Sequence, residues 1–302
     1  MTGCAVAARR RADPLAGTAP PARRWLLLEH PGPWPVDAVA GSGIEPGLLA
    51  EVTGAAQATR TRILLIRRPG RRQAASSRRW LLVAPATATV DGTWHDSAGT
   101  AADSGILAAL AALTGEPPAL ATAPVEPVIL VCAHGVHDTC CAVEGRPVAA
   151  ALAERWPGRV WECSHVGGDR FAPNVVLLPD GFYYGGLDPA GAVGAVAEHL
   201  AGRVPTGNLR GVARWPPAQQ AAVVAAFERY GPLPADAVAV TGARHVGPYG
   251  APGSLTQVQL CVRGQPDTVW AEVAALTRPP AQLTCRALRE TTATEYRVVR
   301  LG

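Results

Sequence analysis

Cysteine and histidine crowd into one short window of this chain. Of the seven cysteines, four lie from Cys132 to Cys163, and three of the seven histidines lie in or directly beside the same window. Thiolates and imidazoles act as nucleophiles and as ligands for soft metal ions. No secretory-signal pattern is expected at the N-terminus, and cysteines outside a secretory context indicate metal or redox chemistry instead of a disulfide framework. This window is therefore the first candidate for a functional site.

The two parts of the window each follow a predicted strand. Val128–Cys132 is a short apolar run, and eight residues separate Cys132 from Cys141. This spacing fits neither the C-x-x-C of thioredoxin nor the pairs of a zinc ribbon, but a loop of this length can fold both sulfurs back onto one metal ion. His165 and Asp169 follow the next predicted strand across two glycines. Loops at strand ends are where functional sites usually lie, so the two segments are expected to converge.

Each of these residues also has an ordinary structural interpretation. Burial within a strand would explain Cys132, and packing at the start of a helix would explain Cys141. Asp169 is also suited to an ion pair with Arg170 or to capping a turn. Cys163 shares a strand face with a tryptophan, which favours a place in the core. Two histidines are expected to be exposed or to support the ligands, namely His134 and His137.

Apolar runs and turn signals predict an α/β fold in which the order of elements repeats. The order is strand–helix–strand–strand–helix up to residue 116, and strand–helix–strand–strand–strand–helix from there to about residue 200. The second order is that of a compact thioredoxin-like layer, and its similarity to the first suggests a duplication. In the C-terminal α+β region, Cys261 and Cys285 lie in strand patterns and are expected to be buried. The expected parts are a disordered tail, an N-terminal α/β half, a thioredoxin-like domain and a C-terminal α+β region, over residues 1–22, 23–125, 126–203 and 204–302.

The composition excludes several classes of protein. With 302 residues, of which 48% are hydrophobic and 17% charged, the chain is too apolar to be disordered. The longest apolar run, Ile106–Leu113, is far shorter than the roughly 20 residues that cross a bilayer, so we expect a cytoplasmic protein without a membrane partner. All 28 basic residues are arginine, which is typical of a GC-rich genome. The net charge of +4 therefore does not indicate a nucleic-acid partner.

Six arginines gather between Arg67 and Arg79. No aromatic residue occurs among them before Trp80, so the aromatic interleaving of a single-strand nucleic-acid groove is missing. The stretch is expected to be a solvated loop or a docking patch for an acidic redox partner.

One segment resembles a known family. It reads VCAHGVHDTCCAVEGRPVAAALAERWPGRVWECSHVGGDRFAPNVVLLPDGFYYGGLDP and is similar to the core of the sucrase/ferredoxin-like family. The N-terminal stretches WLLLEHPGPWPVDAV and WHDSAGT also resemble that family. The resemblance implies a thioredoxin-like [2Fe-2S] ferredoxin domain.

The resemblance also implies a set of cluster ligands. The Cys-x8-Cys pair of the family falls on Cys132 and Cys141, with Cys140 as a neighbour. The His-x3-His pair of its relatives falls on His165 and Asp169, so this chain has a carboxylate at the fourth position. A carboxylate oxygen is a harder ligand than imidazole and can hold ferric iron. The alternatives at the fourth position are Cys163, Cys285, His137 and a solvent molecule.

These features predict a soluble electron-transfer protein that carries a [2Fe-2S] cluster with mixed cysteine and histidine ligation, and not a stand-alone enzyme. Its expected partner is a redox protein, either a reductase or an electron acceptor. Two alternatives stay open. One is a thiol-dependent redox enzyme that uses Cys140 or Cys141 as a nucleophile of low pKa. The other is a structural or interaction module in which the four predicted ligands bind zinc.

Overall fold

The structure has the α/β content that the sequence predicts. It is a computed structural model, and it describes residues 3–70, 78–84, 90–94, 104–115, 126–247 and 254–302. The chain forms two compact units. Unit 1 comprises Met1–Pro21, Gly167–Val175 and Phe182–Gly302, and unit 2 comprises Ala22–Val166 and Val176–Gly181. Most of the cysteine- and histidine-rich window therefore belongs to unit 2.

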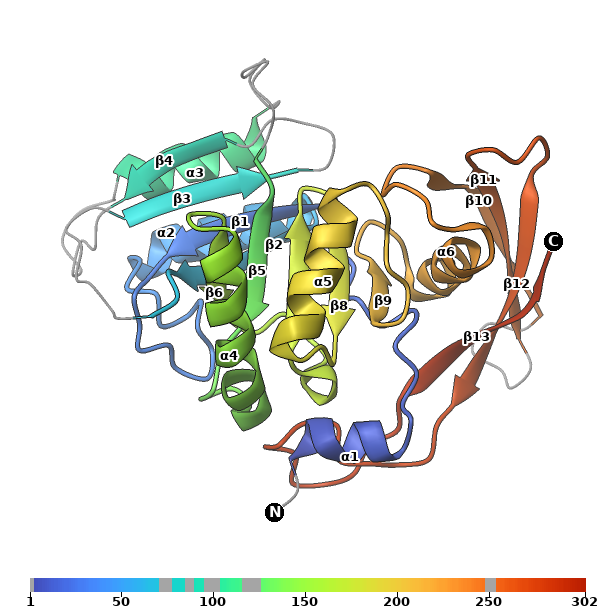
Figure 1. The fold of residues 1–302 in the computed structure, drawn as a ribbon. Coiled ribbons are helices and arrows are strands. Elements are labelled where there is room, and N and C mark those ends of the chain that lie inside the picture. The colour runs from blue at the N-terminus through green and yellow to red at the C-terminus, as the bar shows by residue number, and fades with distance from the viewer. Residues whose placement is uncertain (1–2, 71–77, 85–89, 95–103, 116–125, 248–253) are drawn as a thin grey trace. The chain divides into compact units, whose positions relative to one another are not determined.

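Unit 2 is built on a mixed sheet in which neighbouring strands follow the order β4-β3-β1-β2-β6-β5 (Figure 1). The bounds of these strands are β1 Arg24–Glu29, β2 Thr61–Arg67, β3 Arg78–Val83, β4 Val90–Trp94, β5 Val128–Cys132 and β6 Val160–Cys163. The helices of unit 2 are α2 Pro46–Ala58, α3 Ser104–Thr114 and α4 Thr139–Arg155. A further strand, β7 (Asn174–Leu178), has residues in both units.

Two strand–helix–strand segments of unit 2 share one arrangement. Strands β1 and β2 run parallel and are connected through α2, and strands β5 and β6 run parallel and are connected through α4. A parallel pair requires such a crossover, because a tight turn can join only antiparallel strands. Strands β2 and β6 pair antiparallel, with Ile66 opposite Cys163 and Arg67 opposite Glu162. We call this junction between the two segments the seam.

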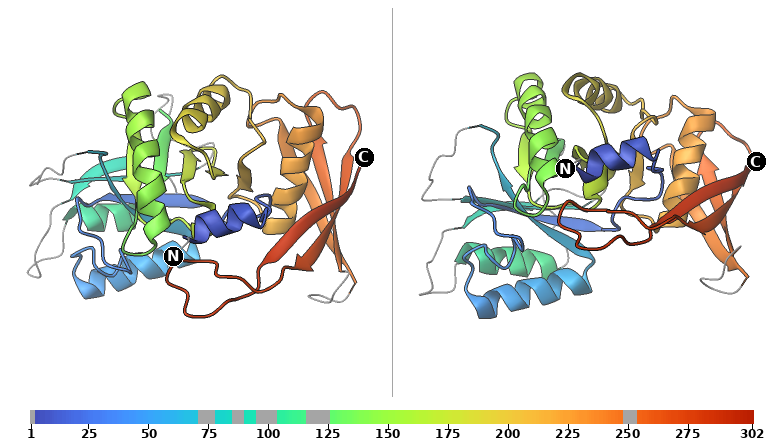
Figure 2. Two further views of the ribbon diagram at one scale, coloured as in Figure 1. Left: turned by 60° about the horizontal axis from the view of Figure 1, so that its bottom comes forward. Right: turned by 90° about the horizontal axis from the view of Figure 1, so that it is seen from below.

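Helices cover both faces of this sheet. Helices α2 and α3 lie side by side on one face, and α4 lies on the other (Figure 2). All of β5 is buried, as are residues 25–28 of β1, which is expected for strands enclosed on both faces. The α2–α3 face holds a hydrophobic cluster whose members include Leu26, Leu28, Val52, Leu65, Ile106 and Leu113. This cluster fixes the sheet whose strand ends carry the candidate ligands.

Unit 1 contains a four-stranded antiparallel sheet in the order β10-β11-β12-β13, against which helix α6 packs. Strands β8 and β9, which form an antiparallel pair, also belong to this unit. The strands are β8 Phe182–Gly185, β9 Leu209–Val212, β10 Val238–Val246, β11 Leu255–Val262, β12 Val269–Thr277 and β13 Thr294–Leu301. The helices are α1 Cys4–Arg10, the short 3-10 helix η1 Asp169–Phe171, α5 Pro189–Leu200 and α6 Pro217–Tyr230.

A buried arginine ties the N-terminal segment to the rest of unit 1. Arg210 is fully buried and donates hydrogen bonds to Thr18 Oγ1 at 3.1 Å and to Asn174 Oδ1 at 2.6 Å. It also donates to the carbonyl of Gly167 at 2.9 Å, so its buried charge is well solvated by protein atoms. Gly168 has φ +77°, and a Cβ there would collide with the guanidinium, which explains the glycine at this position.

The N-terminal segment differs from the prediction. The sequence predicts a disordered tail over residues 1–22, whereas Cys4–Arg10 form helix α1 with Cys4 buried. Helix α1 packs on η1, and Cys4 meets Cys285 across 281 positions of the chain. Local sequence does not encode contacts of this range. Cys261 and Cys285 also differ from the expected burial, since Cys261 is exposed on β11 and Cys285 is half-buried in the loop between β12 and β13.

Several other expectations concern the surface and the linkers. Arg67 is buried, which corrects the interpretation of the start of the arginine-rich stretch as a solvated loop. The middle of that stretch (71–77), most of the WHDSAGT segment (95–100) and most of the proline-rich linker (116–125) lie outside the described residues. Among the helices that the structure describes, none is both long enough and apolar enough to cross a bilayer.

Candidate metal centre

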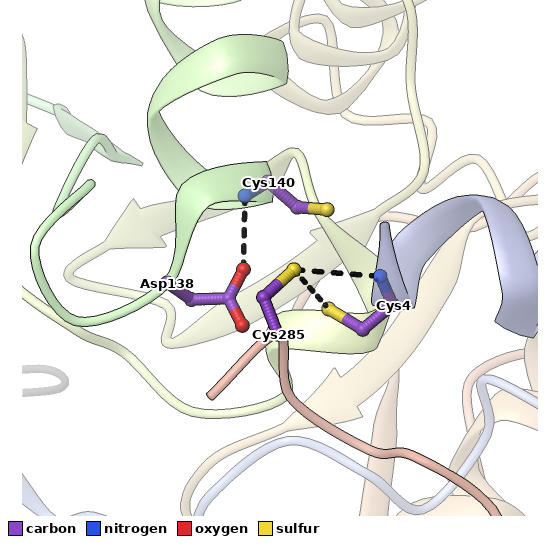
Figure 3. Close-up of side chains that lie close together, drawn as sticks. All are labelled: Cys4, Asp138, Cys140 and Cys285. Carbon is purple, nitrogen blue, oxygen red and sulfur yellow. Dashed lines mark hydrogen bonds between the residues drawn. The ribbon is translucent and has the colours of Figure 1, made fainter. Parts of the chain in front are cut away.

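Cys132 and Cys141 are neighbours because a strand end meets a helix start. Cys132 is the last residue of β5, and helix α4 begins shortly after it. The Asp138 carboxylate caps this helix by accepting a hydrogen bond from the Cys140 backbone N–H at 2.9 Å (Figure 3). A Cβ at Gly145 would collide with the Cys132 carbonyl, so the glycine allows α4 to approach β5 closely. Both thiols are enclosed, with Cys132 0% and Cys141 1% exposed.

The surroundings of Cys132 favour its thiolate. A hydrogen bond from the Cys141 thiol is the main reason why the pKa of Cys132 falls from 9.0 to about 7. Burial opposes this fall, because it penalises the charged form. The backbone N–H groups of His134 and Val166 donate to the same sulfur, and the nearby charge of His165 also lowers the pKa. Cys132 is therefore prepared to act as a thiolate ligand even though it is buried.

Cys163 has the opposite character. It ends strand β6 opposite Cys132 on the parallel partner strand and is fully buried. Burial, followed by the negative charge of Cys132, raises the pKa of Cys163 well above its ordinary value. The neutral thiol is therefore the favoured form, which suits a core residue better than a metal ligand.

Three histidines gather at the same strand ends. The rings of His137 and His165 are stacked, with their centroids 3.8 Å apart and their planes inclined by 24°. The His134 ring lies next to His137, at a centroid distance of 5.5 Å. Its Nδ1 accepts a hydrogen bond from the His165 backbone N–H at 3.3 Å. The three imidazoles thus form one cluster at the strand ends of unit 2, and His165 interacts electrostatically with Cys132.

A loop of the N-terminal half holds these histidines. His134 Nε2 lies 2.7 Å from the carbonyl oxygen of Pro35, to which it donates because its Nδ1 is already an acceptor. Both ring nitrogens of His134 are engaged in this way, and burial lowers its pKa, so His134 is a neutral supporting residue. His137 Nδ1 lies 3.2 Å from the Val36 carbonyl oxygen, and Trp34 packs edge-on against His134. A proton on Nδ1 of His137 leaves the lone pair that a metal ion requires on Nε2.

Asp169, the predicted fourth ligand, belongs to unit 1. It is buried and begins η1 directly after Gly168. Its neighbour Arg170 forms an ion pair with Asp13 at 3.4 Å. Cys285, another alternative at the fourth position, also belongs to unit 1. Within unit 2, Cys132 and Cys141 are hydrogen-bonded to each other, and His165 interacts electrostatically with Cys132 while its ring stacks on His137.

Sequence reasoning did not assign a role to the loop of residues 34–36, nor did it place His137 against His165. The sequence did contain a sign that this loop matters, because the loop lies within the WLLLEHPGPWPVDAV stretch that resembles the family. Its function in positioning the histidines depends on contacts across 99 and 101 positions of the chain.

The fold and this donor set narrow the class of protein. Buried thiols and partly exposed imidazoles at the ends of parallel strands in an α/β sheet can hold a metal ion or take part in redox chemistry. The family model described as sucrase/ferredoxin-like matches residues 15–211, which is more than half of the chain. The chain therefore belongs to the sucrase/ferredoxin-like family. No curated protein and no solved structure matches it.

Proposed function

We propose that this chain is an electron-transfer protein that binds a [2Fe-2S] cluster. The observation that carries the proposal is the buried Cys132–Cys141 pair, in which one thiol already stabilises the thiolate of the other. Membership of a ferredoxin-related family supports a redox role. A redox protein, as donor or acceptor of the electron, is the proposed partner.

The donor set of unit 2 fits such a cluster. Cys132 and Cys141 would hold one iron as thiolates, and His165 would be a ligand of the other. Asp169 is the proposed fourth ligand, with His137 as the alternative because its ring stacks on His165. When bound, the cluster supplies reversible one-electron transfer, and imidazole ligation of one iron raises its potential relative to an all-cysteine cluster.

The protein's own residues orient the donors and exclude water. The two ring nitrogens of His134 form hydrogen bonds with the His165 backbone N–H and with the Pro35 carbonyl oxygen. These bonds fix the direction in which the loop that carries His165 leaves β6. Asp138 fixes the first turn of α4 and therefore the place of Cys141. Enclosure of both sulfurs keeps solvent and competing oxidants away from them.

A thiol-dependent redox enzyme is the second candidate, and one observation favours it. The lowered pKa of Cys132 is typical of a nucleophilic thiol, whereas the sequence predicts Cys140 or Cys141 as the nucleophile. Reactive cysteines are partly exposed, however, whereas Cys132 and Cys141 are enclosed and Cys140 is 7% exposed. The burial favours ligands over nucleophiles. Zinc at the same donors is the third candidate.

The deciding experiment is a visible absorption spectrum of anaerobically purified protein together with iron, zinc and sulfide analysis. A reddish protein with about two iron and two sulfide per chain is the expected result. Stoichiometric zinc without colour would establish the zinc site instead. A colourless, metal-free protein that fails to take up iron and sulfide on reconstitution would refute the cluster, and loss of a measured thiol-exchange activity on alkylation would then support the enzyme.

A further inference from the structure

Unit 1 contains a second pair of thiols, neither of which belongs to the proposed Cys132–Cys141 pair. Cys4 is the first residue of α1, and Cys285 lies in the loop between β12 and β13. Their sulfur atoms are 3.5 Å apart, and the Cys4 backbone N–H donates to the Cys285 sulfur at 3.4 Å (Figure 3). The fold thus brings the sulfur atoms of two cysteines into contact, although these cysteines are 281 positions apart in the chain.

We propose that Cys4 and Cys285 form a reversible disulfide when the protein meets a hydroperoxide. A disulfide requires the sulfurs to approach to about 2.05 Å, which is roughly 1.5 Å closer than they are. The segment that must move is irregular, since Cys285 lies between the isolated bridge partners Ala281 and Thr291 and close to the fully exposed Leu288. A small shift of this loop is sufficient, while α1 stays in place.

The different exposure of the two thiols sets the order of the reaction. Cys285 is half-buried and Cys4 is buried, so a hydroperoxide reaches Cys285 first. The Cys285 sulfur attacks the peroxide, the O–O bond breaks, and a sulfenic acid and one water or alcohol molecule form. The Cys4 thiol then releases its proton to solvent, and its thiolate attacks the Cys285 sulfur. The S–O bond breaks, and the leaving hydroxide takes up one proton from solvent to form water, so that the protons balance. The two thiols together supply the two electrons that reduce the peroxide.

Nearby positive charge assists the second step. Arg11 and Arg170 both interact electrostatically with Cys4, so their guanidinium groups favour its thiolate over its thiol. The same region is held together by Asp13, whose carboxylate is hydrogen-bonded by Arg11 at 2.9 Å and lies 3.8 Å from Arg278. The disulfide would therefore lock the N-terminal helix to a loop that these ion pairs already hold close to it.

Peptide mapping without reductant tests the proposal directly. Trypsin releases Cys4 in the peptide 1–9 and Cys285 in the peptide 264–286, because cleavage does not occur between Arg278 and Pro279. After hydrogen peroxide treatment and alkylation of the remaining thiols, we expect these two peptides to be joined, and a thiol reductant to separate them. Recovery of both peptides unlinked, with each cysteine alkylated or overoxidised separately, would overturn the proposal.

The chain offers matched controls. Cys261 is exposed on β11 and lies in a different tryptic peptide, so Cys261→Ser should leave the link unchanged, whereas Cys285→Ser should abolish it. Cys132, Cys140 and Cys141 share one further peptide, so a bond formed among them is not mistaken for this one. Mapping iron-free and iron-loaded protein in parallel separates this proposal from the cluster. A link that forms while the cluster colour persists also excludes Cys285 as a ligand.

Discussion

The two strand–helix–strand segments of unit 2 share an arrangement and differ in what their loops carry. In the segment β5-α4-β6, residues 133–138 are a short connection, and it brings the first turn of α4 against the end of β5, where Cys132 and Cys141 meet. In β1-α2-β2, residues 30–45 form a longer connection that presents carbonyl oxygens to His134 and His137. The same arrangement thus carries the proposed cysteine ligands in one segment and contacts to the histidines in the other.

The seam connects these two segments with a buried charge pair. Arg67 Nε donates to Glu162 Oε2 at 2.7 Å, and the two side chains are only 10% and 9% exposed. The Arg67 guanidinium also stacks over the ring of Trp34, at 4.2 Å from its centroid. Because Trp34 packs against His134, the ion pair is in contact with the loop that supports the histidines.

The largest expected effect is loss of the metal from the ligand-bearing segment. Cys132→Ser removes the thiolate that the site stabilises, and a hydroxyl does not replace it because its pKa is far higher. We expect iron content and visible absorption to fall to background, while the exposed control Cys261→Ser retains both. Full iron content in Cys132→Ser would show that the cluster is held elsewhere.

The next effect concerns the seam. Arg67→Met leaves the Glu162 carboxylate buried without its charged partner, and breaking such a pair costs about 3–5 kcal/mol of unfolding free energy. The double variant Arg67→Met/Glu162→Leu removes both charges and should regain most of that loss. Urea unfolding of both variants measures the difference. Equal stability of the two variants would mean that Glu162 finds solvent or another partner when Arg67 is absent.

Some features of the fold can be predicted from the local sequence, and others depend on contacts between residues far apart in the chain. The order of strands and helices from β5 to α5 follows from local patterns, because a strand end and a helix start are both readable over a few residues. In the first half, strand β4 was not predicted. The burial of Arg67 is not readable, since its partner Glu162 lies 95 positions away and the neighbouring arginines suggest a solvated loop. Helix α1 and the stacking of His137 on His165 were missed for the same reason. Each depends on tertiary contacts that override local polarity and propensity.

A smaller effect is a pH dependence of the folding stability, which we expect from the thiol at the end of β5 and not from the end of β1. In iron-free protein, Cys132 has a pKa of about 7 when folded against 9.0 in an unconstrained chain. The thiolate therefore stabilises the fold above pH 9, and this contribution declines as the pH falls and is lost below pH 7. The gain between these limits is about 2–3 kcal/mol at most. Cys163 affects the dependence of the unfolding free energy on pH only at higher pH. Its raised pKa means that ionisation of its thiol destabilises the folded protein there.

Urea unfolding at intervals from pH 7 to 9 measures this slope. Cys141→Ala removes the hydrogen bond that contributes most to the low pKa, so the rise in stability should become shallower. An identical slope in Cys141→Ala would contradict the assignment of the shift to that hydrogen bond. The β1 end has no thiol, so no corresponding effect is expected from it.

The smallest effect compares the two helix starts. Asp138→Ala removes the buried cap of α4 and should cost about 0.5–2 kcal/mol, measured by thermal or urea unfolding. Glu45 caps α2 from a partly exposed position, accepting from the Gly47 and Leu48 backbone N–H groups, so Glu45→Ala should cost less than Asp138→Ala. Asp138→Asn retains an acceptor and should lie between wild type and Asp138→Ala. A greater loss in Glu45→Ala than in Asp138→Ala would reverse the comparison.

The contacts between the 34–36 loop and the histidines also bear on biosynthesis. A ribosome makes Pro35 and Val36 about a hundred residues before His134 and His137, and N-terminal segments begin to fold during synthesis. The sheet order β4-β3-β1-β2 can therefore assemble on the nascent chain and display its carbonyl acceptors before any histidine of the site has been translated. The cysteines and His165 are then synthesised after these acceptors are in place, so the proposed cluster could be inserted only once the exit tunnel has released β6.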